Sequence, residues 1–172
     1  MGLRESLERL AYASYFAELV DGFLGEDDSQ PAAFDLLRSL FSGLLKAQDQ
    51  DLLVRYGELK LVSLMGFMPS LFRCAGCGEA LPLETPKAAF SPSAGGILCN
   101  RCSGQQESFF LKGSSVAALR HMLTADPQRV SVLAMSEDVR VELRLAMRRY
   151  IDYYLAKNLK TLEFLAAIEG GG

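Results

Sequence analysis

The residues with the clearest chemistry are four cysteines, arranged as two Cys-x-x-Cys pairs. Cys74 is paired with Cys77, and Cys99 with Cys102. Each pair can form a tight turn whose two thiolates face one ion, and a hairpin of strands between the pairs would bring the four sulfurs together. The spacing therefore predicts a tetrahedral site for one structural Zn²⁺ ion.

Other uses of these thiols stay open. Iron also accepts a cage of four thiolates. A redox dithiol is disfavoured because there are two matched pairs and neither stands in a βαβ pattern. A catalytic zinc is disfavoured because four cysteines fill the coordination sphere and leave no position for water. Four cysteines in 172 residues are also too few for a disulfide scaffold.

The remaining sequence offers little for catalysis. His121 is the only histidine, and it stands beside Arg120 without a His-Glu-x-x-His pattern. We interpret His121 as a surface or capping residue rather than a general base. The sequence contains neither a glycine-rich phosphate loop nor a Gly-x-Ser-x-Gly nucleophile elbow. The sequence therefore predicts a protein that is not an enzyme.

Charge is distributed unevenly along the chain. The net charge of −3 argues against nucleic-acid binding through overall charge. The first 30 residues are acidic, however, and residues 129–160 are basic. Arginines at intervals of four there predict a stripe along one side of a helix, which is a candidate site for DNA or an acidic protein partner. We call the following residues the basic stripe: Arg140, Arg144, Arg148, Arg149, Lys157 and Lys160.

The basic stripe has an ordinary interpretation as well. A row of charges is typical of a solvated helix face. For an acidic peptide, one arginine fork beside an apolar pocket would dominate the binding. Ile151 and Leu155 are predicted to be exposed near the stripe and to supply that pocket.

Hydrophobic periodicity predicts the elements that position these residues. Apolar residues recur at intervals of three and four in segments that we predict to be helices: 3–23, 31–45, 51–65, 114–122 and 136–158. Residues 72–112 lack this repeat and hold three of the six prolines, with strands predicted at 88–91 and 96–98. The predicted fold is mainly α, a helical bundle with an inserted small zinc-ribbon β-hairpin module that carries the four cysteines.

The bundle and the module are expected to have separate cores, because the module depends on its metal and the helices bury their own apolar stripes. Leu19, Leu37, Leu59 and Leu143 are predicted to be buried in the bundle. The predicted divisions of the chain are the N-terminal part of the bundle, the zinc module, the C-terminal helices and a flexible tail, at 1–70, 71–112, 113–168 and 169–172.

Several stretches resemble the RecO family of bacterial recombination mediators, in the same order along the chain. Residues 7–15 (LERLAYASY) resemble the start of its helical region, and residues 149–155 (RYIDYYL) resemble its last helix. Residues 74–78 (CAGCG) and 90–102 (FSPSAGGILCNRC) are similar to its zinc module. The Phe-Ser-Pro-x-x-Gly-Gly block is the most specific part of the match.

This resemblance implies a non-enzymatic mediator of recombinational DNA repair. RecO-like proteins work with RecR, engage single-stranded-DNA-binding protein, and assist recombinase loading and strand annealing. They generally carry an N-terminal OB-fold that binds single-stranded DNA, whereas the helical pattern here begins at Leu3. We therefore expect either a piece of a longer protein or a shortened relative, with weak binding of single-stranded DNA by itself.

The same resemblance implies a cytoplasmic, nucleoid-associated protein. No stretch approaches the roughly 20 apolar residues of a membrane-spanning helix, and the first residues lack the pattern of a secretory signal. No membrane partner is therefore expected. The alternative function is a stand-alone, zinc-stabilised protein-interaction module that does not bind DNA.

Overall fold

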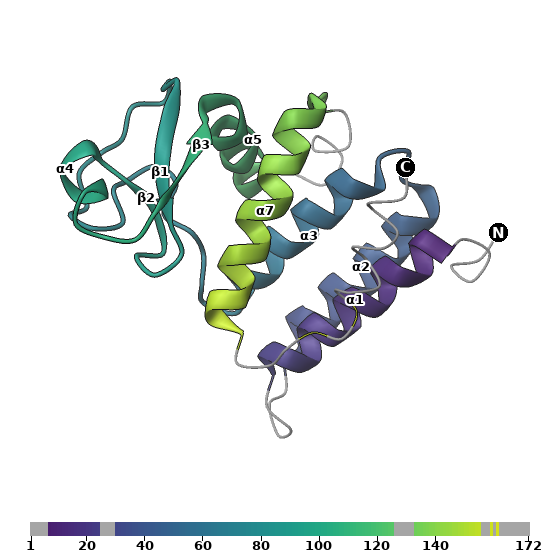
Figure 1. Cartoon of the computed structure of the whole chain (residues 1–172). Coiled ribbons are helices and arrows are strands. Elements are labelled where there is room, and N and C mark those ends of the chain that lie inside the picture. The colour runs from purple at the N-terminus through teal and green to yellow at the C-terminus, as the bar shows by residue number, and fades with distance from the viewer. Residues whose placement is uncertain (1–6, 25–29, 126–132, 156–158, 160, 162–172) are drawn as a thin grey trace.

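The helices form successive layers beside a small sheet. The computed structural model describes residues 7–24, 30–125, 133–155, 159 and 161. The main helices are α1 (Leu7–Phe23), α2 (Pro31–Lys46), α3 (Gln50–Leu64), α5 (Gly113–Thr124) and α7 (Glu137–Tyr154). Helix α3 contacts α1 and α2 on one side and α5 and α7 on the other, so it lies at the centre of the helical body (Figure 1).

The central position of α3 explains its burial. Most of its side chains are buried, including Arg55 and Glu58. At Gly57, α1 and α2 pack closely on α3, because a Cβ atom there would stand 2.5 Å from the ring of Phe16 and 2.8 Å from Leu40. The absence of a side chain at this position therefore permits the close packing of three helices.

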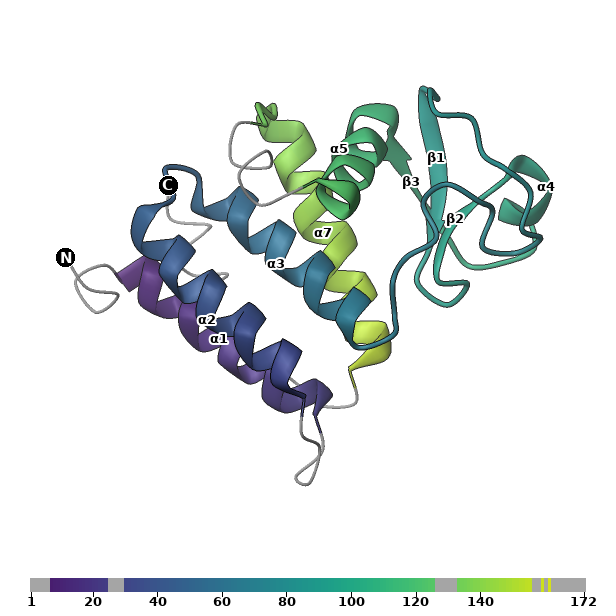
Figure 2. The same cartoon turned by 180° about the vertical axis from the view of Figure 1, so that it is seen from behind.

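The cysteine-rich segment contains a three-stranded antiparallel sheet in the order β2-β1-β3. The strands are β1 (Lys87–Ser91), β2 (Gly96–Leu98) and β3 (Phe109–Lys112), and the short helix α4 (Asn100–Ser103) follows β2. The two predicted strands are confirmed, whereas β3 and α4 were not predicted. Figure 2 shows α5 and α7 between this sheet and α3.

The core of the helices continues into the sheet. One hydrophobic cluster contains Phe16, Leu59 and Leu143 of the helices together with Phe90 and Leu111 of the sheet. The expectation of two separate cores holds only for a small cluster of Cys74, Ala89 and Leu98 beside the cysteines, and it is wrong for the rest of the sheet. The reason is that one face of the sheet packs on the helices, with the ring of Phe90 5.5 Å from that of Tyr150.

Of the four leucines that were predicted to be buried in the bundle, three are buried and one is not. Leu19, Leu59 and Leu143 are fully buried, but Leu37 is only half-buried. Helix α2 lies on the outside of the body, against α1 and α3, so its buried stripe is narrow and runs through Leu40 and Leu44.

The predicted division into 1–70, 71–112 and 113–168 stays a prediction, and 169–172 lies outside the described residues. Within the ranges that the structure describes, no helix is both long enough and apolar enough to cross a membrane.

Candidate functional site

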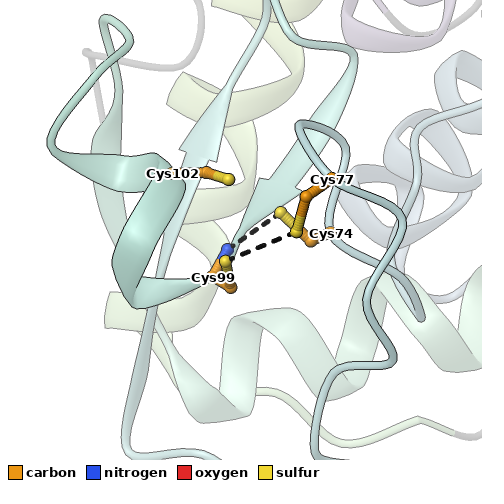
Figure 3. Close-up of side chains that lie close together, drawn as sticks. All are labelled: Cys74, Cys77, Cys99 and Cys102. Atoms are coloured by element: carbon orange, nitrogen blue, oxygen red, sulfur yellow. Dashed lines mark hydrogen bonds between the residues drawn. The ribbon is translucent and has the colours of Figure 1, made fainter.

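Two chain reversals bring the four cysteines together at the end of the sheet (Figure 3). Cys74 and Cys77 lie in a tight turn, closed by the N–H of Gly78 donating to the carbonyl of Cys74 at 2.8 Å. Cys99 follows β2, and Cys102 lies one turn later in α4, where its N–H donates to the carbonyl of Cys99 at 3.0 Å. The prediction that a hairpin brings the two cysteine pairs together is therefore confirmed.

The four sulfur atoms lie close enough together to surround one metal ion. The four Sγ atoms all lie within 4.8 Å of one another, and those of Cys77 and Cys99 are 3.8 Å apart. A tetrahedron with metal–sulfur bonds of roughly 2.3 Å has an edge of roughly 3.8 Å. Cys74 is buried, whereas Cys77 is exposed. The arrangement can hold a metal ion.

Backbone donors and neighbouring sulfurs act in opposite directions on the thiols. Burial alone would raise the pKa of Cys74, but N–H groups of Cys99, Cys77 and Gly76 lower it to about 6. The N–H of Cys99 lies 3.2 Å from that sulfur. The pKa of Cys102 is raised to about 12, mainly by its hydrogen bond with Cys99 and to a smaller extent by burial. A bound cation would compensate the charge of thiolates held this close together.

The first two members of the basic stripe face inward. Arg140 donates to both carboxylate oxygens of Asp49, at 2.9 and 2.5 Å, and Arg144 donates to Asp51 at 3.3 Å. Burial would raise the pKa of Asp49, but hydrogen bonds from Arg140 and from the N–H of Leu52 lower it overall. These arginines therefore join α7 to the start of α3.

The other members of the stripe have different surroundings. Arg148 donates to both oxygens of Asp152 at 3.0 and 2.8 Å on an exposed part of α7, and the guanidinium of Arg149 lies 4.7 Å from the ring centre of Phe109. Lys157 and Lys160 lie outside the described residues. A binding role for the stripe stays a prediction.

The prediction of an apolar pocket beside the basic stripe, formed by Ile151 and Leu155, is wrong. Ile151 in α7 and Leu155 directly after it are both buried, because their side chains belong to the common core. Ile151 occurs one turn after Met147 on the same face, and both side chains are fully buried.

The structure also reveals a cleft on the outer face of the sheet that the sequence did not indicate. The cleft has a volume of about 460 Å³ and is lined by the segment 79–82, by β1 and β2, and by Phe110, Arg101 and Arg120. The residues before Lys112 are apolar and aromatic and could have signalled a strand. Nothing local could have indicated that Arg120 is buried among distant carbonyls.

Comparison with known proteins assigns this chain to a family. The family model described as Recombination protein O C terminal matches residues 4–163. A DNA repair protein RecO of Symbiobacterium thermophilum is 36% identical over 165 residues, covering 95% of this chain and 65% of the relative. One of Desulforamulus reducens is 34% identical over 165 residues, covering 95% of this chain and 63% of the relative.

A third relative extends the match slightly. The DNA repair protein RecO of Dehalococcoides mccartyi strain 195 is 32% identical over 168 residues, covering 98% of this chain and 66% of the relative. The chain thus spans just under two thirds of the length of these curated relatives. Because the family model matches nearly all of it, the chain belongs to the RecO family, through the C-terminal part of that family.

Proposed function

We propose that this chain serves in recombinational DNA repair as a non-enzymatic adaptor of the RecO type. In this role it contacts single-stranded DNA, single-stranded-DNA-binding protein and RecR in the cytoplasm, close to the nucleoid, and it assists recombinase loading and strand annealing. The observation that carries the proposal is the colinear family match over residues 4–163, whose named relatives are DNA repair proteins.

A salt series of DNA binding tests the nucleic-acid part of this proposal. Anisotropy of a labelled single-stranded oligonucleotide is measured at increasing salt, and a linear fall of log affinity with log salt is expected. Capture of purified RecR and of purified single-stranded-DNA-binding protein on the immobilised chain tests the adaptor part. Failure of both measurements would overturn the proposed function.

A protein-interaction module without DNA binding is the second candidate. It is favoured by the pairing of Arg140 and Arg144 with Asp49 and Asp51, which removes charge that a phosphate backbone would need. Capture of a protein partner together with no oligonucleotide binding at low salt would select this alternative.

We further propose that Cys74, Cys77, Cys99 and Cys102 bind one structural Zn²⁺ ion. The support is the close approach of four sulfurs, a donor set that zinc accepts in closed tetrahedral sites. Such an ion would fix the two cysteine turns against each other, and the chain supplies no open ligand position for water. Elemental analysis of the purified protein should give one zinc per chain, and iron in its place would overturn the assignment.

The exposed part of the basic stripe remains a candidate for an anionic partner. Arg148 and Arg149 are the stripe members whose side chains are accessible among the described residues. Arg148→Ala and Arg149→Ala are compared with Arg38→Ala, which removes an exposed arginine paired with Asp35 on α2. Graded losses of DNA affinity would indicate a phosphate track, one dominant loss for an acidic peptide would indicate an anchor, and no change beyond the control would refute the site.

A further inference from the structure

The cleft on the outer face of the sheet is built around a buried arginine. Arg120 of α5 is 7% exposed, and its guanidinium donates to the carbonyl of Leu71 at 2.8 Å and to those of Pro82 and Leu83 at 3.0 and 2.6 Å. These bonds tie Leu71 and the segment around Pro82 to α5. Because hydrogen bonds to a charged group are strong, the wall of the cleft is fixed before any ligand arrives.

An aromatic ring and an ammonium group stand together at the open side of this cleft. Phe110 of β3 is 61% exposed, which is unusual for a phenylalanine on a strand. The Nζ atom of Lys87 on β1 lies 4.6 Å from the centre of the Phe110 ring. Strand pairing of Ala89 with Phe110 sets Lys87 and Phe110 diagonally on the same face of the sheet.

The charge around the cleft is predominantly positive. Lys87, Arg101 and Arg120 line it, and Glu79 is the one acidic residue among its lining residues. Glu79 is paired with Arg101 at 3.0 Å, and both side chains are largely exposed. The floor is apolar, formed by residues such as Ala89 and Leu98. An anionic ligand with a flat apolar part therefore complements this surface.

We propose that this cleft binds one nucleotide of a single-stranded nucleic acid, with its base stacked on Phe110 and its neighbouring phosphate held by Lys87. Aromatic rings accept any base because every base presents a π face, and lysine supplies the point charge that a phosphate needs. The proposal rests on the nucleic-acid contact proposed above and gives it a location away from the basic stripe.

The arrangement favours a nucleotide over an acidic peptide. A peptide carboxylate is bound best by the free fork of an arginine. The fork of Arg120 is already directed at three carbonyl groups, and Arg101 is engaged with Glu79. The remaining cation, Lys87, lies beside the ring of Phe110. In this position it can contact the phosphate of a nucleotide whose base stacks on that ring.

Fluorescence offers a direct test because the chain contains no tryptophan. Phe110→Trp introduces a single indole at the mouth of the cleft, and oligothymidylate is expected to quench its emission on binding. Heparin, a polyanion without bases, is expected to leave that emission unchanged. Phe34→Trp is the matched control, since Phe34 is 67% exposed on α2.

Affinity measurements on the whole chain complete the test. Phe110→Ala should weaken binding of oligothymidylate about 5- to 100-fold, the range expected for one base stacked on an aromatic ring. Phe110→Tyr should preserve the affinity, because the ring is retained. Lys87→Ala should weaken binding and reduce its salt dependence by about one ion. Phe34→Ala and Arg38→Ala serve as controls.

The possible outcomes separate this proposal from the function on which it rests. If the wild type binds oligothymidylate and the changes at Phe110 and Lys87 act no differently from the controls, the cleft is not the site, although the nucleic-acid contact stands. If the wild type binds no oligonucleotide, the nucleic-acid contact fails together with the cleft. Binding of a polyglutamate peptide that depends on Phe110, without oligothymidylate binding, would overturn the proposal in favour of a peptide site.

Discussion

The phenolic hydroxyl of Tyr154 donates a hydrogen bond of 3.0 Å to the carbonyl oxygen of Pro92, and so joins the end of α7 to the turn between β1 and β2. The neighbouring Tyr150 donates to the carbonyl of Phe67 at 3.1 Å. On the other side of the turn, the N–H of Ile97 and the carbonyl of Ser70 are 2.9 Å apart. The Phe-Ser-Pro-x-x-Gly-Gly block is therefore one of the places where the cysteine module is attached to the helices.

Gly96 shows why this block needs glycine. Its φ of +150° lies in a region that L side chains rarely adopt, and a Cβ atom there would stand 2.3 Å from the carbonyl oxygen of Ser70. The close backbone approach of β2 to Ser70 therefore depends on the absence of a side chain at Gly96.

Removal of the Tyr154 hydroxyl should weaken the attachment. Tyr154→Phe keeps the ring, which is stacked on Phe67 at 4.5 Å, and deletes only the hydrogen bond. The free energy of unfolding should fall by about 0.5–1.5 kcal/mol, measured by urea denaturation. Tyr153→Phe is the control, because Tyr153 is 56% exposed, and should have little effect. Equal effects of the two changes would contradict the assigned role of Tyr154.

Loss of one cysteine should affect more than the cysteine module. Cys99→Ser should lower the zinc content measured by elemental analysis and leave the remaining thiols reactive toward a thiol reagent. Because Phe90, Ile97 and Leu111 belong to the same core as the helices, the thermal midpoint of the helical far-UV signal should fall as well. Ser103→Ala in α4 is the control. If a zinc-free variant kept the thermal midpoint of the helices unchanged, the stability of the helices would not depend on the cysteine module, and this prediction would be wrong.

The ion pair between Arg140 and Asp49 should stabilise the contact of α7 with α3. Both side chains are mostly buried, 21% and 26% exposed. Arg140→Ala should lower the free energy of unfolding by about 1–2 kcal/mol, because it removes two charged hydrogen bonds from a partly buried site. Arg148→Ala, which breaks a more exposed pair with Asp152, should have an effect of about 0.5 kcal/mol or less. A larger effect for Arg148→Ala would refute this ranking.

The stability that the ion pair of Arg140 with Asp49 provides should depend on pH. The pKa of Asp49 is lower in the folded chain than its ordinary value, so the folded state binds its proton less readily than the unfolded state. The stabilisation is therefore complete above the ordinary pKa of about 4 and is lost as the pH falls through the lower folded value. Asp49→Asn should flatten this part of the stability profile, measured by denaturation at a series of pH values. An unchanged profile would contradict the assignment.

Core substitutions should separate the two faces of α2. Leu40 is 3% exposed, whereas Leu37 is only half-buried. Leu40→Ala should lower the free energy of unfolding by about 2–5 kcal/mol, since it leaves a cavity among three helices. Leu37→Ala should have a clearly smaller effect, and Leu45→Ala, at an exposed position, should have almost none. Denaturant midpoints provide the comparison, and a larger loss for Leu37→Ala than for Leu40→Ala would invalidate the assigned packing.

The cysteine cluster and most of the main helices could be predicted because their signals are local. A Cys-x-x-Cys turn places two thiols within a few residues, and a short hairpin is enough to join Cys77 to Cys99. The apolar repeat in the segment around Leu59 likewise follows from the geometry of a single helix. Strand β3 was missed although the apolar and aromatic residues before Lys112 could have signalled it, and it leads directly into α5.

By itself, the sequence determined the clustering of Cys74 with its three partner cysteines, the identity of the family, and the mainly helical fold. Only the tertiary structure decided that Arg140 meets Asp49, 91 residues away, and that Arg120 holds the wall of a cleft through the carbonyls of Pro82 and Leu83. The physical reason is that periodicity specifies which residues share a face of a helix, whereas the partner of that face depends on how distant segments pack together.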